Sequence, residues 1–463
     1  MLAASGYRVD VFLFTVGNSI PMSALNGAEE TVLKLEKSRA RSMNESMNIG
    51  IFVTSMRPVG PSQARLQEAI FTGLKKLNGH RYHFMVFSYD AAPPSNLRGE
   101  MFSYHRIAQH GRWGAAVRRA RARLARRALG GLSLLASGGR VRERLTSWIK
   151  LEPKYYQQFR DLNVRLLWNM HQHELNTPVP YIRTIWDTNH RIHPVYPEYS
   201  YTRFTFDGLD GNLTYSLARA SYVIVGTEEG KKQLVSMFGV HEGKVRVIPF
   251  PTPIFSHSDK FFGQASKKPG RLPYLLYPAR FWPHKNHVII LAAMKVLQDR
   301  FDTKFHCVFC GADEGNLGYV LRYAEKLGVR DRVEYMGLVS EEELALLYKD
   351  AFALVYASAV GPDNIPPLEA MSFGCPVIAA DVSGAREQYG DAVLYFDSMR
   401  EQELAERINE LRENNSVRER LIRRGQDRAK NWTADDYARA VLSIIDEFAT
   451  VARSWEKCDS VFT

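Results

Sequence analysis

Residues 361–381, GPDNIPPLEAMSFGCPVIAAD, combine residue types that could hold a negatively charged ligand. Pro366 and Pro367 suit the first turn of a helix, because their fixed φ is helical and their missing N–H groups would be unpaired there anyway. The start of a helix carries partial positive charge, and the backbone N–H groups of Asn364 and Ile365 would point toward a bound anion. The stretch therefore predicts a helix start that binds a diphosphate.

Glu369 lies about one turn into the same helix. A carboxylate does not bind a phosphate, but it accepts hydrogen bonds from two vicinal hydroxyl groups, such as those of a ribose. An acidic residue in the first turn also compensates the helix dipole without any ligand. Both interpretations stay open from this stretch alone.

A second stretch, PARFWPHKNH, carries the cations Arg280 and Lys285 between a segment typical of a strand and one typical of a helix. Two cations at such a junction can neutralise a diphosphate and stabilise the charge that develops as it leaves a sugar. Basic residues at a strand–loop–helix junction are also common without any ligand. Together with the proline-started helix, this pair favours a diphosphate site.

These stretches lie within two series of alternating strands and helices. Short apolar, β-branched segments alternate with amphipathic ones, which is typical of parallel sheets covered on both faces. Ser340 and Glu343 add a capping-box pattern, which fixes one helix start. The expected strands are MNIGIFVT, YHFMVFSYD, VRLLWNM, YIRTIWD, SYVIVGT and KVRVIPF, then YLLYPAR, KFHCVFCG, VEYMG, AFALVYAS, PVIAAD and AVLYFD. We predict an α/β fold with two Rossmann-like, doubly wound parallel-sheet domains that face each other across a cleft.

Shifts in composition set the expected domain bounds. A segment rich in Pro, Ser, Lys and Gly separates the two series and has the composition of a linker. The last segment has apolar residues at helical spacing, and such a helix closes the second domain or crosses back to the first. The expected parts are an appendage at 1–46, an N-terminal domain at 47–253 with a basic insertion at 106–150, a linker at 254–272, a C-terminal domain at 273–431 and the final helix at 432–463.

Several unusual loops follow expected strands. They are MRPVGPS with Gly60, DTNHRIHP with Asp187 and His190, GADEGN with Gly311, and GPDNIPPLE with Asp363. In open parallel sheets, ligands bind beyond the carboxyl ends of the strands. The loops therefore predict a ligand-binding cleft between the two domains.

The positive charge of the chain is concentrated in one segment. The formal net charge of the 463 residues is +11 at pH 7, and the segment from Arg106 to Lys150 holds eleven arginines and one lysine against one glutamate. From Arg112 to Arg127 a narrow apolar stripe lies in a cationic helix pattern, which is typical of a helix on an anionic membrane surface. A solvated insertion is the alternative. Nucleic-acid binding ranks last because neither interleaved aromatic residues nor a known module is present, and we expect no nucleic-acid partner.

The sequence also bears on location. No window offers the roughly 20 apolar residues of a membrane span, and the start lacks the layout of a secretory signal. Cys307 and Cys310 lie three apart on an expected strand, so they would face opposite sides and not share a metal. We expect reduced thiols and a cytoplasmic protein, with contact to the inner face of the membrane through the basic segment as a further option.

The second series resembles the retaining, nucleotide-sugar-dependent glycosyltransferases of the GT-B fold, glycosyltransferase family 4. The likeness is carried by YPARFWPHKN, FCGADEGN, VEYMGLVSEEELALLYKDAFALVYAS and IPPLEAMSFGCPVIAADVSGAREQYGDAVLYFD. VIVGTEEGKKQLVSMFGVHEGKVRVIPF resembles the end of the N-terminal domain of that family. The likeness runs over roughly residues 48–448, apart from the basic segment.

The resemblance implies roles for individual residues. Arg280 and Lys285 would bind the donor diphosphate, and Glu369, which matches the second glutamate of the Glu-x7-Glu motif of the family, would bind the ribose of the nucleotide. The other donor-binding positions that it implies are Gly60, Gly311, the loop residues Asp363, Asn364 and Ile365, and Gly337 and Leu338 in the base pocket.

Two positions depart from the family pattern. Gly361 stands where the first motif glutamate is expected, so the donor sugar would be held by Asp363 or by the backbone. Trp186 precedes Asp187 where many relatives have a histidine, and His190 would then serve the acceptor side together with Asp187. A histidine in a loop is otherwise often a surface residue.

The resemblance implies transfer of a mannose-like or glucose-like hexose from a nucleotide diphosphate sugar to a polysaccharide or lipid-linked saccharide, with retention. No Asp-x-Asp pattern accompanies the diphosphate loops, so we predict no metal and no cofactor besides the nucleotide sugar as donor substrate. The departure at Gly361 keeps open a non-catalytic nucleotide-sugar-binding or scaffold protein. A sugar phosphorylase or synthase of the same fold is the other alternative.

Overall fold

The computed structural model describes residues 46–53, 61–79, 81–89, 101–107, 154–170, 177, 179–200, 206–252 and 273–455. From Met47 onward these residues belong to one compact unit. Gly60, the run from Arg112 to Arg127, residues 1–45 of the appendage and the linker at 254–272 lie outside the described residues. What the sequence predicts for these segments therefore stays a prediction.

The first domain is built on a seven-stranded sheet whose described strands pair in parallel in the order β3-β2-β1-β4-β5-β6-β7. Residues of β1 and β4 are buried almost throughout, as expected for strands whose two faces are both covered. The strands are β1 (Met47–Phe52), β2 (Tyr82–Ser88), β3 (Phe102–Arg106), β4 (Leu166–Asn169), β5 (Tyr181–Thr184), β6 (Tyr222–Val225) and β7 (Val245–Val247).

The second domain is built on a six-stranded parallel sheet in the order β10-β9-β8-β11-β12-β13. This is the strand order of nucleotide-binding Rossmann sheets, and it reverses between β8 and β11, where a crevice opens at the carboxyl ends. The predicted fold class is therefore confirmed. The strands are β8 (Tyr274–Pro278), β9 (His306–Cys310), β10 (Val333–Tyr335), β11 (Ala353–Tyr356), β12 (Val377–Ala380) and β13 (Leu394–Phe396).

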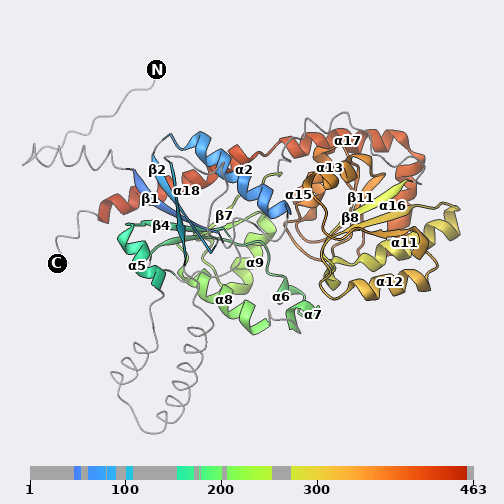
Figure 1. The fold of residues 1–463 in the computed structure, drawn as a ribbon, viewed down its shortest axis with the longest axis horizontal. Helices are drawn as coiled ribbons and strands as arrows, with labels where there is room; N and C mark the ends of the chain where they lie inside the picture. Colours follow the sequence, from blue (N-terminus) through green and yellow to red (C-terminus); the bar gives the residue numbers. More distant parts are fainter. Residues whose placement is uncertain are drawn as a thin grey trace, which may run out of the picture. The chain divides into compact units, whose positions relative to one another are not determined.

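Helices alternate with the strands in both domains (Figure 1). In the first domain they are α2 (Pro61–Leu77), α5 (Lys154–Asp161), α6 (Asn189–Ile192), α7 (Pro197–Ser200), α8 (Phe206–Arg219), α9 (Glu228–Phe238) and the short η2 (Glu242–Lys244). In the second they are η3 (Pro283–Lys285), α11 (His287–Phe301), α12 (Leu317–Lys326), η4 (Arg330–Arg332), α13 (Glu341–Asp350), α14 (Pro366–Ser372), α15 (Ala385–Tyr389), α16 (Glu401–Glu413) and α17 (Asn415–Lys430), and α18 (Ala434–Trp455) follows. Within the described part of the chain, every helix is too short or too polar to cross a membrane.

Local signals set two helix starts near the carboxyl edge of the second sheet. The capping box before α13 is present: Ser340 Oγ accepts from the Glu343 N–H at 3.1 Å, and the Glu343 carboxylate accepts from the Ser340 N–H at 2.9 Å. Helix α14 begins at Pro366, as the paired prolines predict, and it ends before Gly374, whose φ of 70° favours glycine. These two helix starts follow from sequence signals within a few residues.

Strand β3, beside the basic segment, is not predicted from the sequence. This strand forms the edge of the described sheet, and its residues FSYHR are half-exposed or exposed. An edge strand with one covered face has no continuous apolar run, and apolar runs were the signal used for the other strands. The exposure of β3 therefore explains why the sequence does not predict this strand. The predicted insertion at 106–150 overlaps its last residue, Arg106.

The final helix packs on the first domain. Figure 1 shows α18, in red, beside the blue helix α2. Tyr437 and Ile445 are buried in one apolar cluster with Leu66 and Ile70 of α2. The last described helix of the chain thus completes the hydrophobic core of the first domain.

We expect Ile445→Ala to lower the free energy of unfolding by about 2–5 kcal/mol, because it leaves a cavity between α18 and the first sheet. Ile445 is fully buried, whereas Val451 on the same helix is 49% exposed. Val451→Ala is the matched control and should change stability by less than about 0.5 kcal/mol. Thermal and urea unfolding followed by circular dichroism measure both, and equal effects would contradict this packing.

Candidate functional site

A cavity of about 590 Å³ lies between the carboxyl ends of the two sheets. The first domain contributes residues that follow β5, among them Asp187 and His190. The second domain contributes Arg280 and Lys285 after β8, and residues 360–364 after β11. The cavity thus occupies the point where the strand order of the second sheet reverses, which is where ligands bind in such sheets.

Six of the residues that the sequence predicts for the site line this one cavity. They are Asp187, His190, Arg280, Lys285, Asp363 and Asn364. They come from five separate loops or short helices, so only the fold brings them together. Glu369, Gly311, Gly337, Leu338 and Ile365 are not among the lining residues.

Lys285 is one of the cations that line the cavity. Its Nζ donates to Ser358 Oγ at 3.3 Å and lies 3.5 Å from the Tyr356 hydroxyl oxygen. Burial lowers the pKa of Lys285 to about 8, although the charges of Asp187 and Glu198 act in the opposite direction. The ammonium group is therefore charged at neutral pH and has lost much of its water.

Arg280 lies closer to the surface. Its side chain is 40% exposed, and Nη1 donates to Glu314 Oε1 at 2.8 Å. Because an exposed ion pair holds its partners weakly, the guanidinium can exchange Glu314 for a bound anion at little cost. The cavity therefore offers two half-buried cations on the side of the second domain, of which Lys285 is the more strongly desolvated.

Asn364 is held by the protein itself. Its side-chain oxygen accepts from the Tyr356 hydroxyl at 2.8 Å, and its Nδ2 donates to the Gly361 carbonyl at 2.7 Å. Its backbone N–H, which the sequence analysis assigns to a phosphate, donates to Gln388 Oε1 at 2.9 Å. In this structure that N–H group is already bonded, so a phosphate would have to displace Gln388.

Gly361 occupies the position of the missing motif glutamate. Its φ of 114° lies in the region that side chains disfavour, and a Cβ there would come within 3.0 Å of the Asn364 side chain. A glutamate would therefore be strained unless the loop changed its path. The backbone conformation of this loop thus favours glycine over glutamate at position 361.

Glu369 is fully buried beside the cavity and forms a bridge between the domains. Its carboxylate accepts from Arg65 Nη2 of α2 at 2.6 Å and from the Tyr348 hydroxyl at 2.8 Å. The Arg65 side chain is only 3% exposed. Arg65 lies 304 positions from Glu369, so no local sequence pattern predicts this partner.

The remaining predicted donor residues lie at the same edge of the second sheet. The Gly311 N–H donates to the Gly337 carbonyl at 2.7 Å, and a Cβ on Gly311 would come within 2.2 Å of the Ala279 carbonyl oxygen. Leu338 is 64% exposed, whereas Ile365 is buried in the core of the first domain. Glycine at position 311 therefore allows the backbone to pack closely against Ala279, and Leu338 presents an apolar surface.

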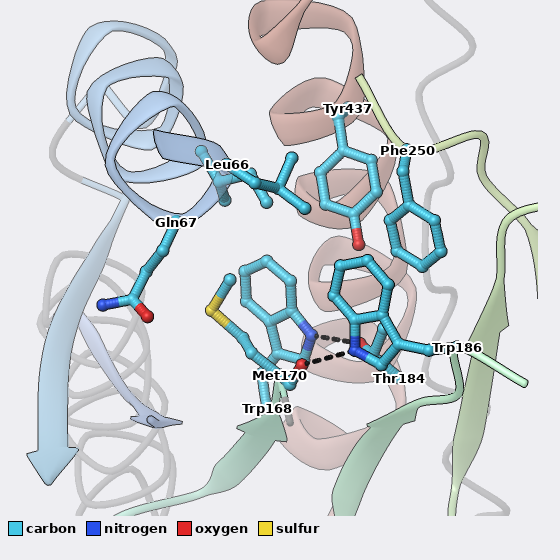
Figure 2. Close-up of a pocket in the computed structure, with 9 residues that line it drawn as sticks. Leu66, Gln67, Trp168, Met170, Thr184, Trp186, Phe250 and Tyr437 are labelled. Atoms are coloured by element: carbon cyan, nitrogen blue, oxygen red, sulfur yellow. Dashed lines mark hydrogen bonds between the residues drawn. The ribbon is translucent and has the colours of Figure 1, made fainter. Parts of the chain in front are cut away.

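Trp186 lines both the cavity and a small neighbouring pocket. Figure 2 shows the rings of Trp168, Trp186, Phe250 and Tyr437 around this pocket of about 10 Å³, which is the size of one water. The Trp186 ring stacks on Phe250 with centroids 4.1 Å apart, and its Nε1 donates to the Met170 carbonyl at 3.3 Å. The tryptophan that replaces the expected histidine is thus part of an aromatic wall.

His190 lies at the first-domain side of the cavity and is buried. Its Nε2 lies 3.3 Å from Asp210, which also accepts from Arg191 Nη2 at 3.0 Å. Burial lowers the pKa of His190, while the hydrogen bond and charge of Asp210 act against this. The ring is neutral at pH 7 and is not the exposed surface histidine of the alternative interpretation.

Glu198 and His284 also line the cavity, and neither is predicted from the sequence. His284 Nδ1 hydrogen-bonds Glu198 Oε1 across the domains, and the His284 backbone N–H donates to the same oxygen at 3.3 Å. Its position directly before Lys285 was the only available signal, because the sequence does not show that Glu198 approaches it.

The described residues include no group of three or more His, Cys, Asp or Glu side chains in an arrangement suited to a metal ion. Cys307 and Cys310 are free and buried on β9. The polar groups of the cavity are therefore cations, carboxylates, histidines and amides.

Residues 258–428 match the family described as "Glycosyl transferases group 1". The chain is 29% identical over 220 residues to the O-antigen chain mannosyltransferase RfbU of Salmonella typhimurium (strain LT2), which covers 47% of this chain and 58% of that protein. The matched region thus spans less than two thirds of that relative. The sequence similarity is therefore to glycosyltransferases, and it is centred on the second domain.

Solved structures share the fold over most of the chain. A sucrose-phosphate synthase from Thermosynechococcus elongatus superposes with a TM-score of 0.62 at 16% identity, covering 88% of this chain and all of that one. The Anabaena protein Alr3699/HepE, in complex with UDP-glucose, superposes with a TM-score of 0.58 at 15% identity, covering 87% of this chain and all of that one. These likenesses support the two-domain GT-B fold.

We expect Arg65→Met to destabilise the protein by about 3–5 kcal/mol, because it leaves the buried Glu369 charge without its cation. The double variant Arg65→Met/Glu369→Gln should recover part of this loss, which a double-mutant cycle in urea unfolding measures. Lys295→Met, which breaks an exposed pair with Asp299, is the control and should have little effect. Strictly additive effects of the two substitutions would show that the ion pair is not coupled.

Proposed function

We propose that this protein is a glycosyltransferase that binds a nucleotide diphosphate sugar in the cavity and transfers its hexose to a saccharide hydroxyl. The observation that carries the proposal is the meeting of Arg280 and Lys285 with the Gly361–Asn364 loop at the reversal of strand order. Two half-buried cations suit a diphosphate that gains charge as it leaves. The match to group 1 glycosyltransferases covers the same loops.

The donor is proposed to lie along the carboxyl edge of the second sheet. Its diphosphate would contact Arg280 and Lys285, and its base would rest near Gly337 and the exposed Leu338. Glu369 is proposed to bind the ribose, which requires the hydroxyl groups to replace Arg65 at its carboxylate. The fold neighbour HepE is solved with UDP-glucose, which supports a nucleotide sugar as the ligand class.

The acceptor is proposed to enter from the first domain, where Asp187 and His190 line the cavity. The relative RfbU is named as an O-antigen chain mannosyltransferase, which supports a polysaccharide or lipid-linked saccharide acceptor and a mannose-like or glucose-like donor. We also propose a cytoplasmic enzyme that contacts the anionic inner face of a membrane through the segment from Arg112 to Arg127, because its sequence pattern is that of a cationic helix with an apolar stripe.

The chemistry is proposed to rest on electrostatics at the leaving group. As the glycosidic bond breaks, the sugar becomes cation-like and the diphosphate takes the electron pair, which Lys285 and Arg280 stabilise. Because these cations neutralise the diphosphate, we propose that the reaction needs no metal ion. We further propose that the acceptor attacks the face from which the diphosphate leaves, which gives retention.

A second candidate is a nucleotide-sugar-binding protein without catalysis. It is favoured by Gly361, since the loop leaves no room for the first motif glutamate without a change of path. Donor hydrolysis distinguishes the two functions, because a pure binder keeps its affinity for nucleotide diphosphates but never releases them from a donor sugar.

We expect one nucleotide sugar from a panel of UDP-, GDP-, ADP- and dTDP-linked hexoses to raise the melting temperature. At a hundredfold excess over its Kd, a ligand stabilises the folded state by about 2.7 kcal/mol. Lys285→Ala and Glu369→Gln should each weaken this ligand roughly tenfold or more, because each removes a charged hydrogen-bond partner. Isothermal titration calorimetry measures the affinities, and the control Lys295→Ala should leave them unchanged. Full affinity in both site variants would refute this diphosphate position.

Donor affinity should also depend on pH through Lys285. The pKa of its ammonium is about 8, so the charge is present below pH 8 and is lost as pH rises above it. We expect the affinity for the nucleotide sugar to fall roughly tenfold between pH 7 and pH 10. Lys285→Arg keeps its charge over this range and should flatten the profile. An identical decline in both proteins would assign the pH dependence to another group.

A further inference from the structure

The pair formed by Glu198 and His284 has a geometry that fixes the histidine ring. Glu198 lies on α7 of the first domain and His284 on η3 of the second. Their side chains are only 5% and 11% exposed, and both line the cavity. The Tyr199 ring stacks on the imidazole at 6.3 Å with an interplanar angle of 16°. The Ala359 N–H holds the backbone by donating to the His284 carbonyl at 2.9 Å. Glu198 thus holds the edge of the His284 ring, Tyr199 holds its face, and Ala359 holds the His284 backbone.

The carboxylate partner determines which ring nitrogen carries the proton. Burial favours the neutral carboxyl, but hydrogen bonds from the His284 ring and from backbone N–H groups outweigh it and lower the pKa of Glu198. A charged carboxylate only accepts hydrogen bonds, so Nδ1 of His284 carries the proton and Nε2 presents a lone pair. Across the described residues no hydrogen bond engages Nε2.

Burial keeps His284 neutral at physiological pH, although the carboxylates around it act in the opposite direction. Burial and the neighbouring Lys285 lower the pKa of the imidazole, whereas Glu198 and Asp187 raise it. Tyr196 and Tyr199 complete the surroundings with their rings. The outcome is a neutral hydrogen-bond acceptor next to the proposed diphosphate position.

We propose that Nε2 of His284 binds the attacking hydroxyl group and acts as the general base of the transfer, with Glu198 as its positioning residue. The inference rests on the proposed function. In the step, the hydroxyl oxygen forms a bond to the anomeric carbon while the bond from that carbon to the diphosphate oxygen breaks. The electron pair leaves with the diphosphate, and the hydroxyl proton passes to Nε2, where the Glu198 carboxylate stabilises the imidazolium. Solvent takes up the proton afterwards.

Other polar residues of the cavity are less suited than His284 to act as the general base. Arg280 and Lys285 only donate hydrogen bonds, so they cannot take the hydrogen of a hydroxyl group. Burial and the charge of Glu387 raise the pKa of Asp363, so the ionised form that could take up the proton is disfavoured. His284 and Lys285 both lie on η3 and both line the cavity, so the base and the cation for the diphosphate come from the same short helix. This placement is compatible with same-face attack.

The test uses hydrolysis of the nucleotide sugar found in the binding screen, with water as the smallest hydroxyl acceptor. We expect His284→Ala to lower turnover about 100-fold, the usual range for a lost general base, with donor affinity within threefold of the parent protein. His241→Ala, at an exposed histidine outside the cavity, is the matched control and should leave turnover unchanged.

The pH profile of Glu198→Gln separates catalysis from a structural role. Turnover of the parent protein should fall below pH 6.5 as His284 takes up a proton. Glu198→Gln removes a charge that raises the pKa of His284, so this acid limb should move to lower pH. If the pair were merely structural, Glu198→Gln would lower the amount of folded protein and leave the acid limb of the pH profile unchanged. Nitrogen-15 NMR of the imidazole should in addition show a proton on Nδ1 of the parent protein.

Two results would overturn the inference while leaving the proposed function intact. One is turnover of His284→Ala within threefold of the parent, and the other is an acid limb of Glu198→Gln that coincides with the parent limb. A parent protein that binds the donor but never hydrolyses it refutes both the transferase and its base. A parent protein that binds no nucleotide sugar refutes the proposed function itself.

Discussion

The reversal of strand order between β8 and β11 is the constraint on which the site depends. All strands of the second sheet run in parallel, so every loop that follows a strand lies at one edge. At the reversal, successive helices turn to opposite faces, and the loops after β8 and β11 are left on either side of a crevice. Arg280 and Lys285 follow the first of these strands, and residues 360–364 follow the second. Their meeting is therefore a consequence of topology, and the chemistry of the cavity follows from it.

The fold and one side of the site could be predicted from the sequence because their signals are local. Continuous apolar runs mark strands buried on both faces, and paired prolines and a capping box mark helix starts within a few residues. Contacts between the domains carry no such signal. Arg65 lies 304 positions from Glu369, and Glu198 lies 86 positions from His284. No spacing rule relates residues so far apart, so the partners of Glu369 and His284 emerge only from the packed structure.

The two departures from the family pattern each have a physical explanation in their surroundings. Trp186 extends an aromatic cluster that includes Phe250 and Tyr437, and Tyr437 comes from α18. Gly361 adopts a φ of 114° in a loop that the Asn364 side chain closes by donating to the Gly361 carbonyl. A histidine at 186 would lose the stacking area of an indole, and a glutamate at 361 would strain the loop. At both positions, the surrounding residues thus favour the residue that is present over the one that the family pattern expects.

Charge compensation explains how the cavity holds its cations before any ligand arrives. Taking a lysine out of water disfavours its charge, which is why burial lowers the pKa of Lys285 to about 8. Asp187 and Glu198 offset part of this cost from the first domain, and Glu198 also fixes His284. The same carboxylate therefore acts on both the cation and the histidine. A diphosphate that enters adds negative charge next to Lys285 and restores its preference for the protonated form. Because the polar groups are already oriented by buried partners, little reorganisation remains to be made when charge develops on the leaving group.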